Sequence, residues 1–308
     1  MKKVLITGGT GFLGSNIIKN LNKDFEITSI SRKKITQNYL PRVEYLFFDI
    51  SKYNLTRKFL KKKEFDFIIN CCGNINHSQK NETFKAHLKA VKNLIKIFKK
   101  KKIKKFIQIG SCLEYGNSKS PQSESSLSLP QSNYGKAKYL ASKEIAKNFP
   151  NNYLILRLYQ IFGPLQKLDR LIPITIDSCL KDESFSCTKG NQLRDFLFID
   201  DFIKLIQKIL KSRNSDIKGI YNVGSGKPYK VNFIIKKINQ LVKKGDPQFG
   251  KIKMRKDEIM KLYPSIKKVK KEFKWSPNIN IDRGLNKTIN HYKKIKTLLK
   301  TKKDYKCS

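Results

Sequence analysis

The sequence opens with Met1-Lys2-Lys3-Val4-Leu5-Ile6-Thr7-Gly8-Gly9-Thr10-Gly11-Phe12-Leu13-Gly14, which predicts a strand, a glycine turn and the start of a helix. The apolar residues 4–6 are typical of a strand buried on both faces of a parallel sheet. Gly8, Gly11 and Gly14 permit a tight turn, a close approach of the backbone to a pyrophosphate, and close packing of the next helix. The stretch therefore predicts the first half of a βαβ unit with a dinucleotide site. A glycine turn that serves packing alone is the alternative.

Apolar runs alternate with helical spacing through the first half of the chain. We expect strands at 25–30, 43–48, 65–70, 106–109 and 153–158, and helices at 55–63, 82–100 and 134–148. This alternation predicts a doubly wound α/β fold, with a parallel sheet covered by helices on both faces.

Beyond Gly163-Pro164 the alternation loosens. Here we expect short strands at 185–188 and 220–224, and helices at 171–180, 200–211, 231–244 and 282–299. The predicted first domain comprises 1–162 plus about 195–224. A second, smaller, discontinuous α/β domain would comprise about 163–194 plus 225–308.

Composition limits the class of protein. The 308 residues include 66 Lys and Arg against 24 Asp and Glu, a net charge of +42 at pH 7. Such a charge suggests nucleic-acid binding, but only nine of these basic residues are arginine and the lysines are scattered along the chain. We therefore expect no nucleic-acid partner, although the positive field favours an anionic cofactor and substrate. No apolar run is long enough to span a membrane and the six cysteines lack metal-binding spacing, so we expect a cytoplasmic protein without a metal site.

Two further motifs carry chemistry. In Tyr134-Gly135-Lys136-Ala137-Lys138, Tyr134 and Lys138 are four residues apart and share one face of the expected helix. The lysine ammonium would favour the phenolate and lower the tyrosine pKa, so Tyr134 could donate or accept a proton. Ser111 follows the strand expected at 106–109, at the sheet edge where ligands bind, and could donate a hydrogen bond to a substrate oxygen. A surface Tyr–Lys pair and a serine that only caps the next turn are the alternatives.

These motifs make the chain resemble the extended short-chain dehydrogenases/reductases that act on nucleotide sugars as epimerases, dehydratases and reductases. The resemblance covers nearly the whole chain, in the family's order. The matching segments are 7–14, Asp49-Ile50, Asn70-Cys71-Cys72-Gly73, Ser111, Tyr134, Lys138, 156–164, 194–201, 221–226, 273–277 and Gly284-Leu285. The resemblance implies a Rossmann domain with a smaller discontinuous substrate domain, and a role in cell-surface polysaccharide biosynthesis.

The resemblance also implies which residues bind the cofactor. They are Gly8, Thr10, Gly11, Phe12, Leu13 and Gly14 in the cofactor motif, Asp49 and Ile50 at the adenine, and Cys71, Cys72 and Gly73 beside the nicotinamide ribose.

Catalytic and substrate roles follow from the same resemblance. Tyr134 would move the proton on the sugar oxygen, Ser111 would hydrogen-bond that oxygen, and Lys138 would bind the nicotinamide ribose while tuning Tyr134. Gln160 replaces an asparagine that is common in the sugar epimerases, and Arg194 would hold a substrate phosphate. An ion pair of Arg194 with Asp195 or Asp200 is the alternative.

The end of the second expected strand favours NADP(H). The family often carries an acidic residue there, which accepts hydrogen bonds from the adenosine ribose of NAD. Here Ser31 takes that position and Arg32 follows, so no carboxylate repels a 2′-phosphate and the guanidinium can pair with it. We expect NADP(H) to be preferred while use of NAD(H) stays open; a solvated basic turn is the alternative.

Departures from the family pattern narrow the reaction. Similar 4,6-dehydratases carry acidic residues where this chain has Cys112 and Leu113, and Glu114 lies one place later, so we expect its side chain to point elsewhere. NADPH suits a net reduction, and the Gly-Ser-x-x-Glu-Tyr-Gly form resembles reductases of 4-keto-6-deoxy nucleotide sugars. We therefore expect an NADPH-dependent 4-ketoreductase, with an NAD(P)-dependent epimerase as the alternative and a dehydratase after it. The non-enzymatic alternative is a cofactor sensor or a basic nucleic-acid binder. Many relatives form homodimers, and this chain could do so.

Overall fold

One parallel sheet joins strands of the first half to β10 from farther along the chain, in the order β10-β6-β5-β4-β1-β2-β3. The computed structural model describes residues 1–34, 39–73 and 79–304. The strands are β1 (Lys3–Thr7), β2 (Glu26–Ser31), β3 (Val43–Phe47), β4 (Phe67–Asn70), β5 (Lys105–Ser111), β6 (Tyr153–Leu158) and β10 (Gly219–Val223). The order reverses at β1, which pairs with β2 on one side and β4 on the other. This is the predicted Rossmann topology, in which ligands bind at the carboxyl ends of the strands near that reversal.

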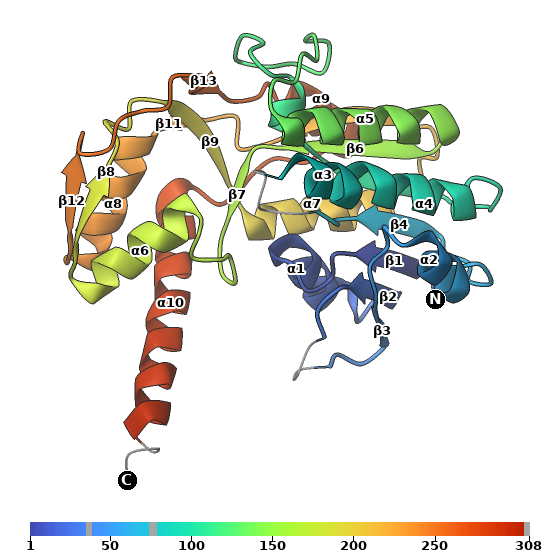
Figure 1. Ribbon diagram of the computed structural model, residues 1–308, viewed down its shortest axis with the longest axis horizontal. Coiled ribbons are helices and arrows are strands. Elements are labelled where there is room, and N and C mark those ends of the chain that lie inside the picture. The colour runs from blue at the N-terminus through green and yellow to red at the C-terminus, as the bar shows by residue number, and fades with distance from the viewer. Residues whose placement is uncertain (35–38, 74–78, 305–308) are drawn as a thin grey trace. The chain divides into compact units, whose positions relative to one another are not determined.

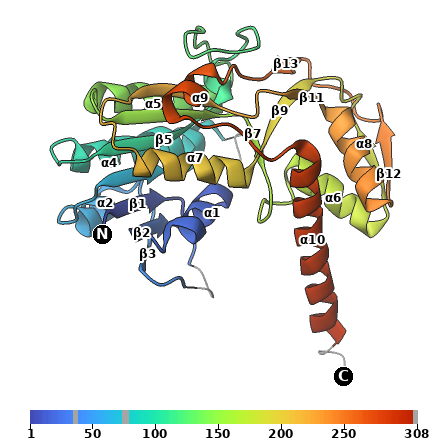
Figure 2. The ribbon, with the colours of Figure 1, turned by 180° about the vertical axis from the view of Figure 1, so that it is seen from behind.

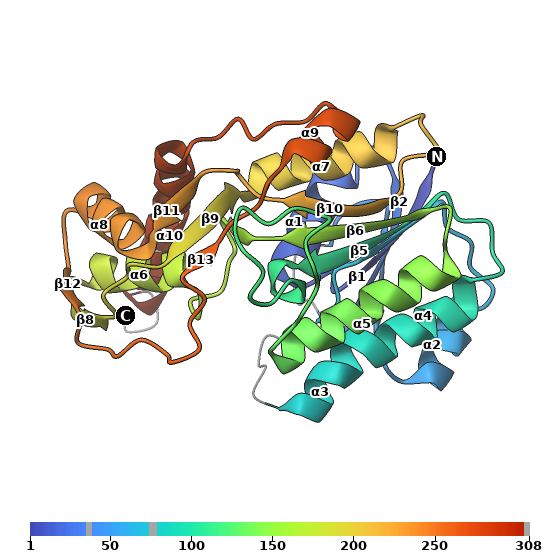
Figure 3. The ribbon, with the colours of Figure 1, turned by 90° about the horizontal axis from the view of Figure 1, so that it is seen from above.

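Helices cover both faces of this sheet (Figure 3). One face carries α2 (Tyr53–Leu60), α4 (Ala90–Phe98) and α5 (Asn133–Asn148). The other carries α1 (Phe12–Leu21) and α7 (Ile199–Lys211), which lie in front of the sheet in Figure 2. The helix expected at 82–100 is divided, because α3 (Lys80–Phe84) passes through a π-helical turn, η1 (Lys85–Lys89), before α4. Such turns are frequent at functional sites.

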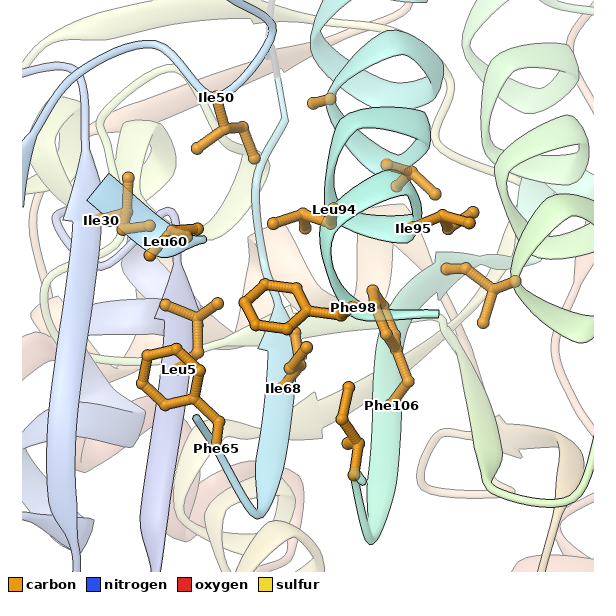
Figure 4. Close-up of a cluster of buried hydrophobic side chains, with 14 of the residues drawn as sticks. Leu5, Ile30, Ile50, Leu60, Phe65, Ile68, Leu94, Ile95, Phe98 and Phe106 are labelled. Atoms are coloured by element: carbon orange, nitrogen blue, oxygen red, sulfur yellow. The ribbon is translucent and has the colours of Figure 1, made fainter. Parts of the chain in front are cut away.

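Apolar side chains fill the space between the sheet and α2, α4 and α5. Leu5, Ile68 and Phe106 project from three neighbouring strands toward Leu94 and Phe98 of α4 (Figure 4). All five are fully buried. Each such side chain stabilises the fold by about 1.5–3 kcal/mol. Because these contacts fix the register of β1, β4 and β5, they also fix where the residues that follow each strand lie.

The chain forms a second unit from Tyr159–Phe202, Gly224–Pro264 and residues 276–304. In it, β9 (Leu193–Phe198) pairs with β7 (Gln160–Phe162), β11 (Pro228–Lys230) and β13 (Lys261–Leu262). A separate pair joins β8 (Ser184–Cys187) to β12 (Asp246–Phe249). The helices of this unit in Figure 1 are α6 (Leu171–Lys181), α8 (Val231–Val242) and α10 (Ile281–Asp304).

Three segments group differently from the domain boundaries expected from the sequence. The first is 159–162, which includes β7 and belongs to the second unit. Residues 195–202 belong to the second unit, because β9 pairs with β7, β11 and β13 and not with the parallel sheet. Residues 265–275 belong to the first, because α9 (Lys267–Phe273) packs on β10. There Lys268 Nζ donates to the Ile220 carbonyl oxygen at 2.9 Å, and the rings of Phe273 and Tyr221 lie 5.1 Å apart.

Candidate active site

The glycine turn after β1 leaves no room for side chains. Gly8 has a φ of +71°, and a Cβ on Gly14 would lie 2.3 Å from the Gly8 carbonyl oxygen. Gly11 is the N-cap of α1, and no side chain caps that helix end. The turn therefore offers backbone amides and the positive end of the helix dipole, which suit a pyrophosphate. The other predicted residues of the turn are exposed or half-buried: Thr10, Phe12 and Leu13.

The residues expected at the adenosine follow β2 and β3. Ser31 ends β2, is buried, and donates its hydroxyl hydrogen to the Lys33 carbonyl oxygen at 3.0 Å. Arg32 is exposed. After β3, Asp49 Oδ1 accepts a 2.8 Å hydrogen bond from the Ser51 amide, and Ile50 is buried. The strand end thus carries the hydroxyl of Ser31, followed by the exposed guanidinium of Arg32, and has no carboxylate at either position.

Cys71, Cys72 and Gly73 follow β4 and border the glycine turn. A Cβ on Gly8 would lie 2.8 Å from the Cys71 carbonyl oxygen. Burial raises the pKa of the Cys71 thiol to about 12 and also raises the pKa of Cys72, so both thiols are neutral near pH 7. A Cβ on Gly73 would lie 2.4 Å from His87 Cε1, so glycine lets the chain pass close to this ring.

A buried hydrogen-bond chain crosses the carboxyl edge of the sheet. The Thr7 hydroxyl donates to Asn70 Oδ1, and Asn70 Nδ2 donates to Gln108 Oε1 at 2.7 Å. The carbonyl oxygen of Ile109 accepts both Gln108 Nε2, at 3.1 Å, and Lys138 Nζ, at 2.7 Å. This series of hydrogen bonds thus links Thr7 of β1 to Lys138 of α5. Gln108 is not among the predicted site residues. The one indication of its role in the sequence is that it is polar within an otherwise apolar strand.

Ser111 ends β5 and caps the 3₁₀ turn η2 (Cys112–Glu114). It is buried, and its hydroxyl oxygen accepts a hydrogen bond from the Leu113 amide at 3.2 Å. A hydroxyl that accepts one hydrogen bond retains its own hydrogen, so Ser111 can still donate to a substrate oxygen. Glu114 turns into the protein, where it accepts from the Ser111 amide at 2.9 Å and pairs with Arg157.

Tyr134 and Lys138 lie one turn apart in α5. Tyr134 is half-buried and Lys138 is buried, with its Nζ 5.9 Å from the Tyr134 ring centroid. Burial lowers the pKa of Lys138, and the charge of Glu114 opposes that change. His87, from the π-helical turn, packs edge-to-face on Tyr134 with the ring centroids 5.0 Å apart. A phenol and an ammonium are therefore held together in the same unit as the glycine turn.

Gly135 brings the start of α5 close to η2. A Cβ at this position would lie 2.4 Å from the Leu113 carbonyl oxygen. The Ser132 hydroxyl caps the helix by accepting the Gly135 amide at 3.0 Å. This close approach holds Tyr134 near the turn that Ser111 begins. Gly135 is not among the site residues predicted from the sequence.

The two predicted substrate residues, Gln160 and Arg194, lie in the second unit. Gln160 begins β7 and is exposed. Arg194 is buried on β9, donates from Nη1 to the Leu193 carbonyl oxygen at 2.8 Å, and forms an ion pair with Glu258. Glu258 is neither of the two acids expected as ion-pair partners of Arg194, which were Asp195 and Asp200.

Asp195, next to Arg194, is fully buried. Its carboxylate accepts hydrogen bonds from the Ser225 amide, the Ser225 hydroxyl and the Gly226 amide, at 2.6, 3.0 and 2.6 Å. Burial raises its pKa to about 6 against the opposing effect of these bonds. Asp195 thereby ties β9 to the turn before β11.

In residues 1–34, 39–73 and 79–304, no cluster of three His, Cys, Asp or Glu side chains could hold a metal ion. No helix in those ranges has the length and apolarity needed to cross a membrane. The five cysteines there form no disulfide.

The model of the NAD dependent epimerase/dehydratase family matches residues 4–224, and the chain therefore belongs to that family, as its motifs predict. A "Putative UDP-glucose 4-epimerase" of Methanocaldococcus jannaschii is 28% identical over 307 residues, covering 94% of this chain and 98% of that protein. CDP-abequose synthase of Salmonella muenchen is 25% identical over 306 residues, covering 94% and 97%.

A solved structure of similar fold is UDP-glucose 4-epimerase of Thermotoga maritima with UDP-glucose. Its TM-score is 0.87 at 20% identity, covering 95% of this chain and 99% of that one. UDP-glucuronic acid 4-epimerase of Bacillus cereus, with UDP-glucuronic acid and NAD, has a TM-score of 0.85 at 24% identity over 95% and 99% of the two chains. These likenesses confirm the predicted fold.

Proposed function

We propose that the protein transfers hydride between a nicotinamide dinucleotide and C4 of a nucleotide sugar, reducing a 4-keto-6-deoxy sugar with NADPH. The observation that carries the proposal is the buried Lys138 ammonium 5.9 Å from the ring centroid of the half-buried Tyr134. The glycine turn in the same unit fits a dinucleotide pyrophosphate. The nucleotide sugars named with the relatives and solved structures support the substrate class.

The glycine turn and the N-terminus of α1 would hold the dinucleotide, which would supply the hydride when bound. Tyr134 gives its phenolic proton to the carbonyl oxygen as that oxygen becomes a hydroxyl. Ser111 donates a hydrogen bond to the same oxygen, where negative charge develops. Lys138 stabilises the tyrosinate that remains and hydrogen-bonds the nicotinamide ribose.

We also propose substrate contacts for two residues of the second unit, Arg194 and Gln160. Arg194 would hold a phosphate of the nucleotide, because a guanidinium fork suits phosphate oxygens, and it would then share its donors with Glu258. Gln160 would contact the sugar.

We propose net reduction, and not oxidation, because the residues at the end of β2 favour NADPH as the cofactor. Ser31 and Arg32 place no carboxylate against a 2′-phosphate, which supports NADPH over NADH. Glu114 is paired with Arg157 inside the protein, so its position gives no support to a dehydratase. The second candidate is 4-epimerisation by transient oxidation and re-reduction, which the epimerases among the relatives and solved structures favour.

A substrate panel tests the proposal. Purified protein is mixed with NADPH and a set of 4-keto-6-deoxy nucleotide sugars, and the absorbance of the reduced nicotinamide is followed. We expect consumption that Tyr134→Phe abolishes and Tyr139→Phe, a change on the same helix, preserves. Interconversion of two sugar epimers without NADPH consumption would instead establish the epimerase. Salt-sensitive retention of RNA without any turnover would contradict both.

The proposal includes a cytoplasmic location, and the five described cysteines, none of which forms a disulfide, support it. Homodimerisation stays a prediction, and light scattering on the purified protein tests it.

A further inference from the structure

Glu114 is a buried acid for which the proposed mechanism has no role. Its side chain is 0% exposed, and its Oε2 accepts a 3.1 Å hydrogen bond from Nε of Arg157, whose side chain is 2% exposed. Removing two charges from water costs several kcal/mol per ion, so such a pair needs good geometry and additional hydrogen bonds. The protein maintains this arrangement within one turn of Ser111.

The carboxylate of Glu114 lies against the backbone of β5 at the catalytic serine. Its Oε1 accepts the Ser111 amide at 2.9 Å, which completes a capping box around η2. A Cβ on Gly110 would lie 2.6 Å from the same oxygen, so the glycine before the serine leaves room for the carboxylate. Gly110 pairs with Arg157 across β5 and β6, which places both partners of the ion pair beside this glycine.

Arg157 is held from two further sides. Its guanidinium carbon lies 4.1 Å from the ring centroid of Tyr115, and its Nη2 donates to Ser128 Oγ at 3.0 Å. The Tyr115 hydroxyl donates in turn to Asn222 Oδ1 of β10 at 2.8 Å. With the guanidinium fixed in this way, the carboxylate of Glu114 has one defined position.

The charge of Glu114 also acts on Lys138, because both groups bind the same short stretch of β5. Lys138 Nζ donates to the Ile109 carbonyl oxygen at 2.7 Å, two residues before the Ser111 amide that Glu114 accepts at 2.9 Å. The groups that face this ammonium are Glu114 from η2, the Cys71 and Cys72 thiols after β4, and Tyr134 on its own helix, on which His87 packs. Both thiols are neutral near pH 7, because burial raises their pKa values. Burial lowers the pKa of Lys138, and the charge of Glu114 is the largest effect that opposes it.

We propose that Glu114 is a positioning residue of the catalytic centre, which holds the Ser111 segment by its amide and supplies the negative charge that keeps Lys138 protonated. The inference rests on the roles of Ser111 and Lys138 under the proposed function. The Glu114 carboxylate thus has two roles, the hydrogen bond to the Ser111 amide and the charge near Lys138. Two substitutions test these roles separately.

Glu114→Gln keeps the length and an acceptor for the Ser111 amide but removes the charge. We expect the alkaline midpoint of NADPH affinity, measured by fluorescence against pH, to move to lower pH by about one unit. The alkaline limb of kcat should move in the same direction. Glu144→Gln is the matched control, because Glu144 lies in α5 and its side chain is 35% exposed. An unshifted midpoint in Glu114→Gln would overturn the charge role.

Glu114→Asp keeps the charge but is one methylene too short to reach the Ser111 amide. We expect its NADPH affinity and alkaline midpoint to match the wild type while kcat falls by roughly tenfold or more. Unchanged kcat would overturn the positioning role. Glu114→Gln alone could fail to fold because Arg157 is left unpaired, and Glu114→Gln/Arg157→Leu then removes both charges. The alkaline midpoint of NADPH affinity in this double variant tests the charge role in the same way.

The two proposals fail in different ways. In one outcome, the wild type binds NADPH but turns over no nucleotide sugar, and Glu114→Gln shifts the midpoint of binding. This outcome contradicts the proposed function and supports the role of the Glu114 charge. Wild-type turnover with no shift in the variant contradicts the role of that charge and leaves the function standing.

Discussion

The ammonium of Lys138 donates a 2.7 Å hydrogen bond to the backbone carbonyl oxygen of Ile109, two residues before Ser111 on β5. This bond fixes the lysine of α5 to the strand that carries the serine. Because the same oxygen also accepts Gln108 Nε2, the lysine is the last member of the hydrogen-bond chain that begins at Thr7 of β1.

Replacing Lys138 by methionine should remove the charge beside Tyr134 and the bond to Ile109. We expect kcat to fall by about 10²–10⁴, because Tyr134 loses the charge that stabilises its tyrosinate and its general acid catalysis fails. NADPH affinity should weaken as well, because the hydrogen bond to the nicotinamide ribose is lost. Steady-state kinetics and fluorescence titration measure the two effects. Lys143→Met, at an exposed position of the same helix, should leave both unchanged. Equal kinetics for the two variants would contradict the role of Lys138.

Arg32→Ala tests the cofactor preference. The exposed guanidinium follows the last residue of β2, so its loss should weaken NADP(H) by roughly tenfold or more and leave NAD(H) nearly unchanged. Calorimetric titration with both dinucleotides gives the two affinities. Lys33→Ala, the next exposed residue, serves as the control. A similar loss for both cofactors in Arg32→Ala would show that Arg32 does not read the 2′-phosphate.

Gly135→Ala should separate α5 from η2. The added methyl would lie 2.4 Å from the Leu113 carbonyl oxygen, so the helix or the turn must shift. We expect a loss of about 1–3 kcal/mol in the free energy of unfolding and a fall in kcat, since Tyr134 moves relative to Ser111. Urea unfolding and kinetics measure these changes. Lys136→Ala, at an exposed site next in the helix, should cost neither, and a wild-type kcat in Gly135→Ala would refute the close-approach argument.

Asp195 should give the second unit a measurable pH dependence of stability. Burial raises its pKa from the usual 3.8 to about 6, so the folded state binds this proton more tightly than the unfolded state. The free energy of unfolding therefore falls as pH rises through that interval, by up to about 3 kcal/mol.

Urea unfolding of the wild type and Asp195→Asn at about pH 4 and about pH 7 measures this contribution. The wild type should lose stability relative to the variant over that interval. Asp200→Asn, whose native side chain is 46% exposed and paired with Lys287, should show no such change. A constant difference between wild type and Asp195→Asn would contradict a raised pKa for Asp195 in the folded protein.

The sequence predicts the parts of this site that are local in the chain. The glycine turn follows directly from β1, and Tyr134 and Lys138 are four residues apart in one helix, so spacing alone places them. Fold class and family were predicted correctly for the same reason, since each motif lies within a few residues. The roles of individual residues stay predictions until the variants are measured.

Features that depend on pairing between distant segments could not be predicted. Glu114 meets Arg157 only through the register of β5 and β6, and Gln108 joins its neighbours only once three strands are aligned. The sheet around β9 escaped prediction because β7, β11 and β13 have two or three residues each, too few to show a period. The π-helical turn at His87 likewise interrupts a helix without any glycine or proline to mark it.

The return of residues 203–223 and 265–275 to the first unit sets the order in which the chain can fold during synthesis. The strands that carry the glycine turn and Ser111 are complete once Ser111 has been made, but the edge strand β10 and the helix α9 that covers it come much later. At ribosomal speeds of about 5–20 residues per second, β6 waits on the order of ten seconds for its parallel partner and the covering helix. During that interval the nascent sheet has an open hydrogen-bonding edge, which makes the unfinished chain a candidate for chaperone binding.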